Sequence, residues 1–249
     1  MQKRAWYLGC TSDQVADRVI LIGDPGRVSR LSRYLDDVES LPVNRGLATA
    51  TGTHRGVRVT LAAFGMGAPI AAIVLHELSE LGSRLFLRIG TAMSLPPTAI
   101  GDFVIADSAL RREGTSYAYA PKDFAATADE KLVSALAQAA EEEGHRYHVG
   151  RFASFDGFYR DMFALDDTTD ARVRSNFQAL ADEGVIAVDM ETAAVLTVGK
   201  VLGCKAGSLC VASVDSKTRK KTDAETLLQR ERQLMSIALA TLTSYSVSR

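Results

Sequence analysis

Cysteine is scarce in this sequence: Cys10, Cys204 and Cys210 are three in 249 residues, with neither an even number nor the spacing of zinc ligands. That usage is typical of a protein kept in the reduced cytoplasm. A net charge of −1 gives no overall attraction to nucleic acid or to an anionic membrane, so any anion must be bound locally. No apolar run approaches the roughly 18 residues of a membrane span, and none follows the charges at the start, so we expect neither an anchor nor a signal peptide.

The composition is that of an ordinary globular protein, with 47% hydrophobic and 24% charged residues. Short apolar runs alternate with longer amphipathic ones, which predicts β-α units on a largely parallel or mixed sheet. The expected strands are residues 19–22, 57–64, 85–89, 102–106, 186–188 and 204–211. The expected helices are residues 28–35, 68–81, 129–143, 169–183, 190–202 and 224–244. No repeat or linker divides the chain, so we predict one α/β domain over residues 1–249.

Three stretches place unusual residues where loops leave predicted strands, the edge at which ligands of such sheets gather. They read LIGDPGRV (residues 21–28), LRIGTAM (87–93) and VDMETAA (188–194). Each has a structural explanation on its own: a tight turn, an ion pair between Arg88 and Asp102, and a carboxylate, Glu191, at a helix N-terminus. Together, Arg27 and Arg88 at two strand ends, joined by Arg45 in VNRG, predict a site for a small oxyanion such as phosphate.

Motifs of several other kinds of site are missing. GMGAPIA lacks the third glycine of a dinucleotide fingerprint, and the chain contains neither a GxxxxGK[ST] phosphate loop nor a GxSxG nucleophile elbow. Its four histidines form no HExxH pattern. We therefore predict no metal site.

Taken in order, LIGDPGRV, VNRG, FGMGAP, LRIGTA, VDMETAA and SVDS resemble the motifs of the hexameric nucleoside phosphorylases, the family of bacterial purine nucleoside phosphorylase and uridine phosphorylase. The resemblance runs from about residue 7 to the final helix. It implies a three-layer α/β/α sandwich with a mixed central sheet. It also implies phosphorolysis: phosphate, the co-substrate, cleaves a nucleoside to a free base and a pentose 1-phosphate, and no cofactor takes part.

The resemblance also implies which residues form the site. Phosphate would be bound by Gly23, Arg27, Arg88 and Thr91, and by Arg45 of an adjacent subunit. The nucleoside would be bound by Met190, Glu191, Phe158 and Met93, and by Tyr7 of the neighbour. Sites shared in this way require at least a dimer, and the family expectation is a hexamer built from three dimers. The expected partners are thus nucleoside, phosphate and further copies of the chain, with no nucleic acid and no membrane.

The identity of the base depends on two loops. Asp215 in SVDS matches the aspartate with which the family's purine phosphorylases protonate the leaving base, so we expect Asp215 to be catalytic together with Arg27. As a general acid, Asp215 would need its proton near neutral pH. The family's uridine phosphorylases read uracil with a glutamine and an arginine, where this chain has Met162 and Ala164. Neither side chain can make those hydrogen bonds, so a purine nucleoside is favoured.

Three alternatives stay open beside a purine phosphorylase. The first is a uridine or other pyrimidine nucleoside phosphorylase. The second is a nucleosidase, which uses water and would not need the three arginines together. The third is a non-catalytic nucleoside-binding relative, which should have lost Asp215 or Glu191. Two departures from the family pattern bear on this choice: Met93 stands where a glycine is usual, and Tyr7 where a histidine is common.

Overall fold

The structure, a computed structural model, describes residues 3–246. The strands are β1 (Arg18–Ile22), β2 (Asp36–Ser40), β3 (Thr49–His54), β4 (Val57–Ala63), β5 (Leu85–Ser94), β6 (Phe103–Arg112), β7 (Ala126–Thr127), β8 (Tyr147–Phe155), β9 (Val185–Asp189) and β10 (Lys205–Asp215). The α-helices are α1 (Pro25–Leu31), α2 (Ala68–Glu80), α3 (Thr115–Tyr119), α4 (Glu130–Glu142), α5 (Asp167–Asp182), α6 (Thr192–Val201) and α7 (Ala224–Ser244). Short turns of other helix types follow α1 at Ser32–Tyr34 and β8 at Phe158–Met162.

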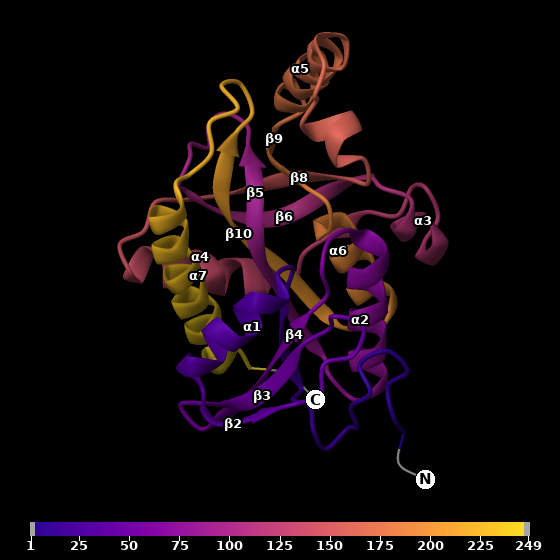
Figure 1. Cartoon of the computed structure of the whole chain (residues 1–249), viewed down its shortest axis with the longest axis vertical. Helices are drawn as coiled ribbons and strands as arrows, with labels where there is room; N and C mark the ends of the chain where they lie inside the picture. The colour runs from indigo at the N-terminus through magenta and orange to yellow at the C-terminus, as the bar shows by residue number, and fades with distance from the viewer. Residues whose placement is uncertain (1–2, 247–249) are drawn as a thin grey trace.

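The strands form one mixed sheet in the order β10-β6-β8-β9-β5-β1-β4-β3-β2, with β7 beside β6 (Figure 1). β10 pairs with β5 as well as with β6, so that β10, β6, β8, β9 and β5 close into a ring. The remaining strands extend from β5 through the parallel pairs β5–β1 and β1–β4. β5 therefore lies at the junction of the ring and the open part of the sheet, with neighbours on both sides.

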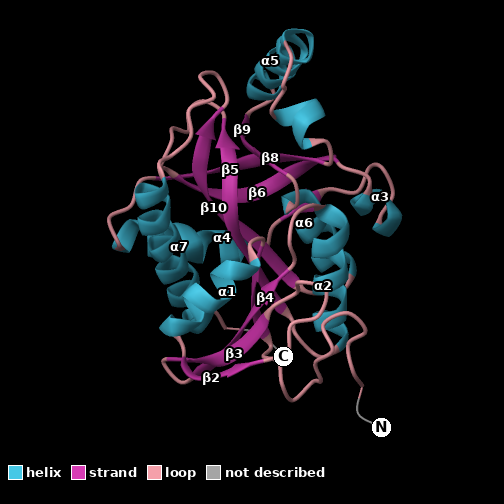
Figure 2. Cartoon of the chain, in the orientation of Figure 1, coloured by secondary structure: helices cyan, strands magenta, loops and turns pink. Residues whose placement is uncertain are grey.

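Helices cover both faces of the sheet, as the alternation of side chains along β1 demonstrates. Val19 and Leu21 belong to a core cluster shared with α2 and α6. Ile20 and Ile22 belong to a second cluster, shared with α1, α4 and α7. The two helix layers lie on opposite sides of the sheet in Figure 2, while α5 packs on a third cluster beside β9. The predicted α/β/α sandwich with a mixed central sheet is confirmed.

Several elements differ from their predicted bounds. The strand expected over 85–89 continues to Ser94, because β10 pairs with it to that residue and β9 pairs with it at Met93. LRIGTAM is therefore strand and not a loop. The helix expected over 28–35 begins at Pro25, because the Asp24 side chain accepts a hydrogen bond from the amide of Gly26 and caps it, and it ends at Leu31. The helix predicted over 224–244 is α7 without change.

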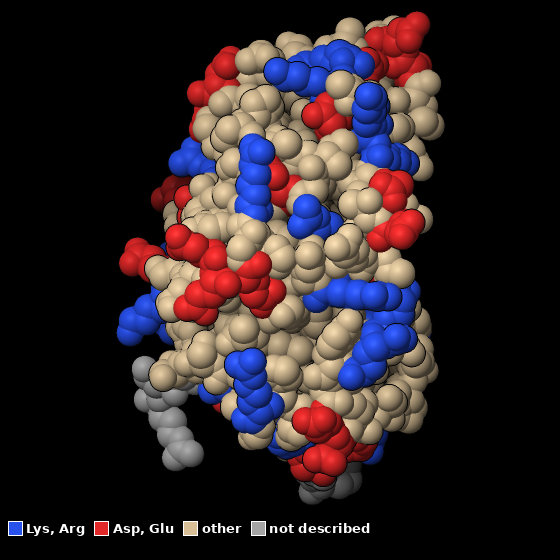
Figure 3. Space-filling view, turned by 90° about the vertical axis from the view of Figure 1, so that its left-hand side faces the viewer, with Lys and Arg blue, Asp and Glu red and all other residues tan. Residues whose placement is uncertain are grey.

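Neither sign of charge dominates the face of the molecule that Figure 3 draws. Among residues 3–246, no helix is both long and apolar enough to cross a membrane. On the face drawn in Figure 3, basic and acidic side chains are interspersed, as the net charge of −1 leads one to expect.

Candidate active site

Arg88 is a deeply buried cation of the candidate site, with 4% of its surface exposed. It can lie flat over β5 because the next inward position is Gly90, where a Cβ atom would come within 3.1 Å of Nη1. Its Nη2 donates to Glu191 Oε2 at 2.5 Å, and Nη1 donates to Cys210 Sγ at 2.7 Å and lies 3.3 Å from Asp189 Oδ2. Asp102, suggested by the sequence as a partner, pairs instead with His148.

In this buried cluster one cation, Arg88, lies between two carboxylates, those of Asp189 and Glu191. Burial disfavours the charge of Arg88, but the carboxylates of Asp189 and Glu191 more than offset it and raise the pKa of the guanidinium. Desolvation raises the pKa of Cys210, which keeps its thiol protonated. The Nε of Arg88 is buried without a hydrogen-bond partner among residues 3–246. Arg88 thus keeps a buried N–H donor that no described protein group uses, and an incoming anion can accept a hydrogen bond from it.

Asp189 and Glu191 reach this cluster from the loop between β9 and α6. Asp189 caps the N-terminus of α6, accepting from the amide of Thr192 at 3.2 Å and from Ser154 Oγ at 2.6 Å. This explains the acid at position 189: it fixes the loop that presents Glu191. Glu191 Oε1 accepts from the amide of Gly67 at 2.7 Å. The half-buried Met190 lies between the two acids and packs on the cluster beside β9.

The turn after β1 approaches the neighbouring backbone closely. A Cβ atom at Gly23 would lie 3.1 Å from the carbonyl oxygen of Gly65. β1 pairs with β5 so that Leu21 lies opposite Arg88, which sets the turn at Gly23 next to the half-buried Thr91 of β5. Arg27 projects from the first turn of α1, where its Nε donates to Glu231 Oε1 at 2.8 Å. Arg88 and Thr91 thus lie within β5, Gly23 follows the end of the neighbouring β1, and Arg27 lies in the first turn of α1 just beyond it.

Asp215 ends β10 and holds its own loop together. Its Oδ1 accepts from the amide of Thr218 at 2.6 Å, from Thr218 Oγ1 at 2.8 Å and from the amide of Lys217 at 3.1 Å. Partial burial acts against the charge, but the hydrogen bonds from Thr218 and Lys217 prevail and lower the pKa of Asp215. This conformation therefore favours the carboxylate, whereas a general acid for a purine needs the protonated form. The nearby Arg219 donates to Asp170 and not to the Asp215 side chain.

The aromatic and methionine residues predicted to line the nucleoside site divide into two groups. Phe158 is 36% exposed, stacks on Phe163 with ring centroids 6.0 Å apart and remains accessible to a ligand. Met93 is 3% exposed and belongs to the same apolar cluster as Met162. Ala164 packs partly buried against that cluster. Positions 162 and 164 thus contribute apolar surface and no hydrogen bonds from their side chains.

Tyr7 and Arg45 form a separate unit. The guanidinium carbon of Arg45 lies 5.3 Å from the centre of the Tyr7 ring, and Asn44 Nδ2 donates to the Tyr7 carbonyl oxygen at 2.6 Å. The amide of Tyr7 donates in turn to Glu77 Oε1 of α2 at 2.7 Å. Within the described chain, no hydrogen bond or ion pair joins Tyr7 or Arg45 to Arg27 or Arg88.

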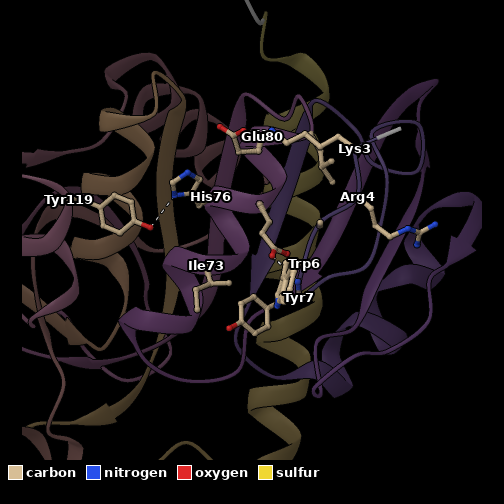
Figure 4. A pocket seen from close by; sticks show the side chains of 11 residues that line it. Lys3, Arg4, Trp6, Tyr7, Ile73, His76, Glu80 and Tyr119 are labelled. Atoms are coloured by element: carbon tan, nitrogen blue, oxygen red, sulfur yellow. Dashed lines mark hydrogen bonds and ion pairs between the residues drawn. The ribbon is translucent and has the colours of Figure 1, made fainter. Parts of the chain in front are cut away.

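Figure 4 shows the ring of Tyr7 at the edge of a cavity of about 330 Å³. The cavity lies between the N-terminal segment, α2 and α3, and is lined by Lys3, Arg4, Ala5, Trp6, Tyr7, Ile73, His76, Glu77, Glu80, Leu81 and Tyr119. The side chain of Trp6 is 84% exposed there. An indole this exposed marks the N-terminal segment as a candidate contact surface.

Sequence reasoning did not identify several residues that shape the site. Gly67, whose φ of +96° suits glycine, donates a hydrogen bond from its amide to Glu191. The motif GMGAP is visible in the sequence, but the sequence does not reveal that its partner is Glu191. Cys210 and Ser154 carry no motif, and Glu231 lies within an ordinary amphipathic helix. In each case the missing information was a contact between residues distant in the sequence.

This chain is similar to known phosphorylases in sequence and to solved uridine phosphorylase structures in fold. A family model described as the phosphorylase superfamily matches residues 17–245. Uridine phosphorylase of Escherichia coli (strain K12) is 33% identical over 241 residues, covering 94% of this chain and 95% of that protein. Guanosine phosphorylase of Halorubrum lacusprofundi is 34% identical over 198 residues, covering 79% of this chain and 77% of that protein. A crystal structure of uridine phosphorylase from Vibrio fischeri ES114 superposes with a TM-score of 0.88 at 28% identity, covering 98% of both chains.

Proposed function

The chain belongs to the phosphorylase superfamily and is a nucleoside phosphorylase, and we propose that it acts on a pyrimidine nucleoside of the uridine class. Phosphate is the co-substrate, and enzymes of this family need no cofactor. The observation that carries the choice of base is the likeness to uridine phosphorylases over 94% of the chain. The sequence motifs alone favour a purine nucleoside, with a pyrimidine nucleoside as the first alternative. The similarity to uridine phosphorylases reverses that order.

The state of Asp215 supports the same choice. The argument for a purine required this residue to donate a proton to the base near neutral pH. Its three hydrogen bonds within the loop and its lowered pKa favour the charged form instead. A uracil leaving group can depart as an anion whose charge is delocalised over its carbonyl oxygens, and so depends less on a general acid.

The buried cluster supports the following division of roles. Gly23, Arg27, Arg88 and Thr91 bind phosphate, Arg45 completes that site from a neighbouring subunit, and Glu191 with Met190 holds the ribose. A phosphate oxygen forms the new bond to C1′ while the N-glycosidic bond breaks and its electron pair leaves with the base. Positive charge that develops on the ribose ring is stabilised by the phosphate dianion and by the Glu191 carboxylate. Such preorganised charge is often the largest catalytic contribution.

The remaining residues complete the proposal. Phe158 supplies a face against which the base packs, Met93 shapes the pocket behind it, and Tyr7 enters the neighbour's site together with Arg45. Residues 1–249 act as one domain, and the active assembly is a hexamer of three dimers. Three free cysteines suit a cytoplasmic location.

A purine nucleoside is the second candidate, supported by the guanosine phosphorylase among the relatives and by the polar groups missing at Met162 and Ala164. The test is a chromatographic assay of the purified protein with uridine, thymidine, inosine, guanosine, adenosine and methylthioadenosine, each with and without phosphate. We expect phosphate-dependent release of uracil. Release of a purine in its place would establish the second candidate, and release without phosphate would identify a nucleosidase. Absence of any release by the folded protein would leave a nucleoside-binding relative.

A further inference from the structure

A buried carboxylate from the C-terminal helix reaches the turn that follows β1. Glu231 of α7 is 8% exposed, although an acid is seldom buried without a cationic partner. It has two such partners: Oε1 accepts from Arg27 Nε at 2.8 Å, and Oε2 accepts from Arg30 Nη2 at 3.3 Å. A negative charge beside a proposed phosphate site requires an explanation, because by itself it would repel the anion.

The atom that Arg27 uses for this contact matters. A guanidinium offers Nε and two Nη nitrogens in one rigid plane. Glu231 takes Nε, and neither Nη of Arg27 makes a hydrogen bond to any residue from 3 to 246. Fixing Nε in this way orients the plane, so the two Nη nitrogens are left to bind an anion through a fork.

The second arginine secures the carboxylate itself. Arg30 Nη2 also donates to Asp24 Oδ2 at 2.9 Å, and Asp24 caps α1 through the amide of Gly26. Burial acts against the charge of Asp24, but the hydrogen bonds from Arg30 and Gly26 outweigh it and lower the pKa of Asp24. A continuous network thus runs from Asp24, the cap of α1, through Arg30 and Glu231 to Arg27, and in it the two arginines balance the two carboxylates.

We propose that Glu231 is a positioning residue for phosphate, which holds Arg27 by its Nε so that both Nη nitrogens face the bound anion. The inference rests on the proposed role of Arg27 in phosphate binding. Through Glu231, α7 affects the affinity for phosphate and leaves the affinity for the nucleoside unchanged. No other residue of α7 belongs to the proposed site.

Two variants separate the reach of the side chain from its charge. Glu231→Asp keeps the charge but withdraws the oxygen by roughly one C–C bond, about 1.5 Å, from Arg27. Glu231→Gln loses the charge but keeps an acceptor oxygen at the same distance. Because the orientation of Arg27 depends on the reach of the acceptor oxygen more than on its charge, and hydrogen bonds weaken steeply with poor geometry, we expect Glu231→Asp to raise the KM for phosphate about tenfold, and Glu231→Gln by less than about threefold. The KM for the nucleoside should change less than about twofold in both variants.

Steady-state kinetics with each substrate varied in turn, together with thermal unfolding, test the inference. Asp102→Asn is the matched control, because it removes a buried carboxylate that pairs with His148 away from this turn. It should affect stability only. A phosphate KM that changes in neither Glu231 variant, or that rises together with the nucleoside KM, would overturn the inference.

Arg27→Met distinguishes this failure from failure of the proposed function. If it raises the phosphate KM strongly while the Glu231 variants do nothing, only the positioning role is lost. If Arg27→Met itself leaves phosphate use unchanged, Arg27 does not bind phosphate and both proposals are wrong at this residue. In the double variant Arg27→Met/Glu231→Asp, we expect no loss beyond that of Arg27→Met alone.

Discussion

Arg88 and Glu191 form a buried ion pair, with 2.5 Å between Nη2 of the arginine and Oε2 of the glutamate. In the proposed mechanism the first residue serves phosphate and the second serves ribose, so one contact connects the two substrate sites. A ligand that weakens the contact between Arg88 and Glu191 when it binds in one substrate site changes the affinity of the other site for its own ligand. By thermodynamic linkage this effect is reciprocal.

Glu191→Gln should separate the two functions of the pair. Nucleoside turnover should fall at least about 100-fold in kcat/KM, because the ribose loses a charged acceptor in a buried site. Breaking a buried ion pair should also lower the free energy of unfolding, by about 3 kcal/mol. Phosphate alone, however, should bind more tightly than to the wild type, since Arg88 no longer shares its Nη2 with a carboxylate. Isothermal titration with phosphate and urea unfolding measure the two effects.

Glu113→Gln is a suitable control for that experiment. Glu113 is 2% exposed and accepts from the amide of Ser116, away from Arg88. Its substitution should cost stability without changing phosphate affinity. Weaker phosphate binding in Glu191→Gln would contradict competition between the carboxylate and the anion for Arg88.

Arg45→Ala should reduce phosphate use severely while leaving the unfolding free energy within about 0.5 kcal/mol, because the side chain is exposed. If Arg45 acts in a neighbour's site, mixed assemblies of Arg45→Ala and Arg27→Met chains regain one intact site per mixed dimer. Random mixing of two inactive variants should then restore about a quarter of the wild-type activity. Mixtures that stay inactive, although subunit exchange is verified, would place Arg45 in its own chain's site or outside any site.

Tyr7 is expected to act in two ways, which two substitutions distinguish. Tyr7→Phe keeps the ring that lies 5.3 Å from Arg45 and removes only the hydroxyl. A rise in nucleoside KM would reveal a hydroxyl contact to the ribose. Tyr7→Leu removes the ring as well, and should in addition raise the phosphate KM about threefold by releasing Arg45. Equal kinetics for the two variants would show that the ring does not position the arginine.

The sequence predicts the buried elements of this fold better than the exposed ones. β1 and α7 follow the apolar periodicities of their residues and were predicted with bounds correct to within one residue. β2 reads DDVES, has all five residues exposed and shows no apolar pattern to detect. The first five residues of β8 are partly or fully exposed, and only Phe152, Ala153 and Ser154 are buried. These strands owe their conformation to pairing with β3, β6 and β9, which the local sequence does not reveal.

The site was predictable where a residue contradicts its surroundings. An arginine within the apolar strand β5 requires an anionic partner, and this singled out Arg88. Glu231 offered no such contrast, because QRERQ is typical of the solvent-facing side of an amphipathic helix. The sequence predicts Asp215 in a loop beyond a strand over residues 204–211, whereas β10 continues to Asp215 itself, and the state of this carboxyl depends on the amides of Lys217 and Thr218. Turn geometry of that kind emerges only in the folded loop.

Asp215→Asn should change the dependence of stability on pH. The folded protein lowers the pKa of this carboxyl below its ordinary value of 3.8, so its charged form contributes stability at neutral pH. That contribution is present above 3.8 and disappears as the pH falls through the lowered value. The wild type should therefore unfold at a higher temperature than Asp215→Asn at pH 7, and the difference should vanish in acid. A difference that grows on acidification would mean that the proton, and not the charge, stabilises the loop.

The same substitution decides whether Asp215 acts as a general acid. If the carboxylate only organises its loop, Asp215→Asn should reduce kcat/KM for uridine and for inosine by similar, modest factors of about three. If it protonates a purine, inosine should lose at least about 100-fold while an activated substrate, such as a nucleoside whose base leaves without protonation, is spared. Parallel kinetics on uridine, inosine and 7-methylguanosine measure these ratios. We expect the first outcome, because the three hydrogen bonds that Oδ1 accepts within the loop favour the charged form of the carboxyl. A selective loss on inosine would restore the purine hypothesis and require the loop to open during turnover.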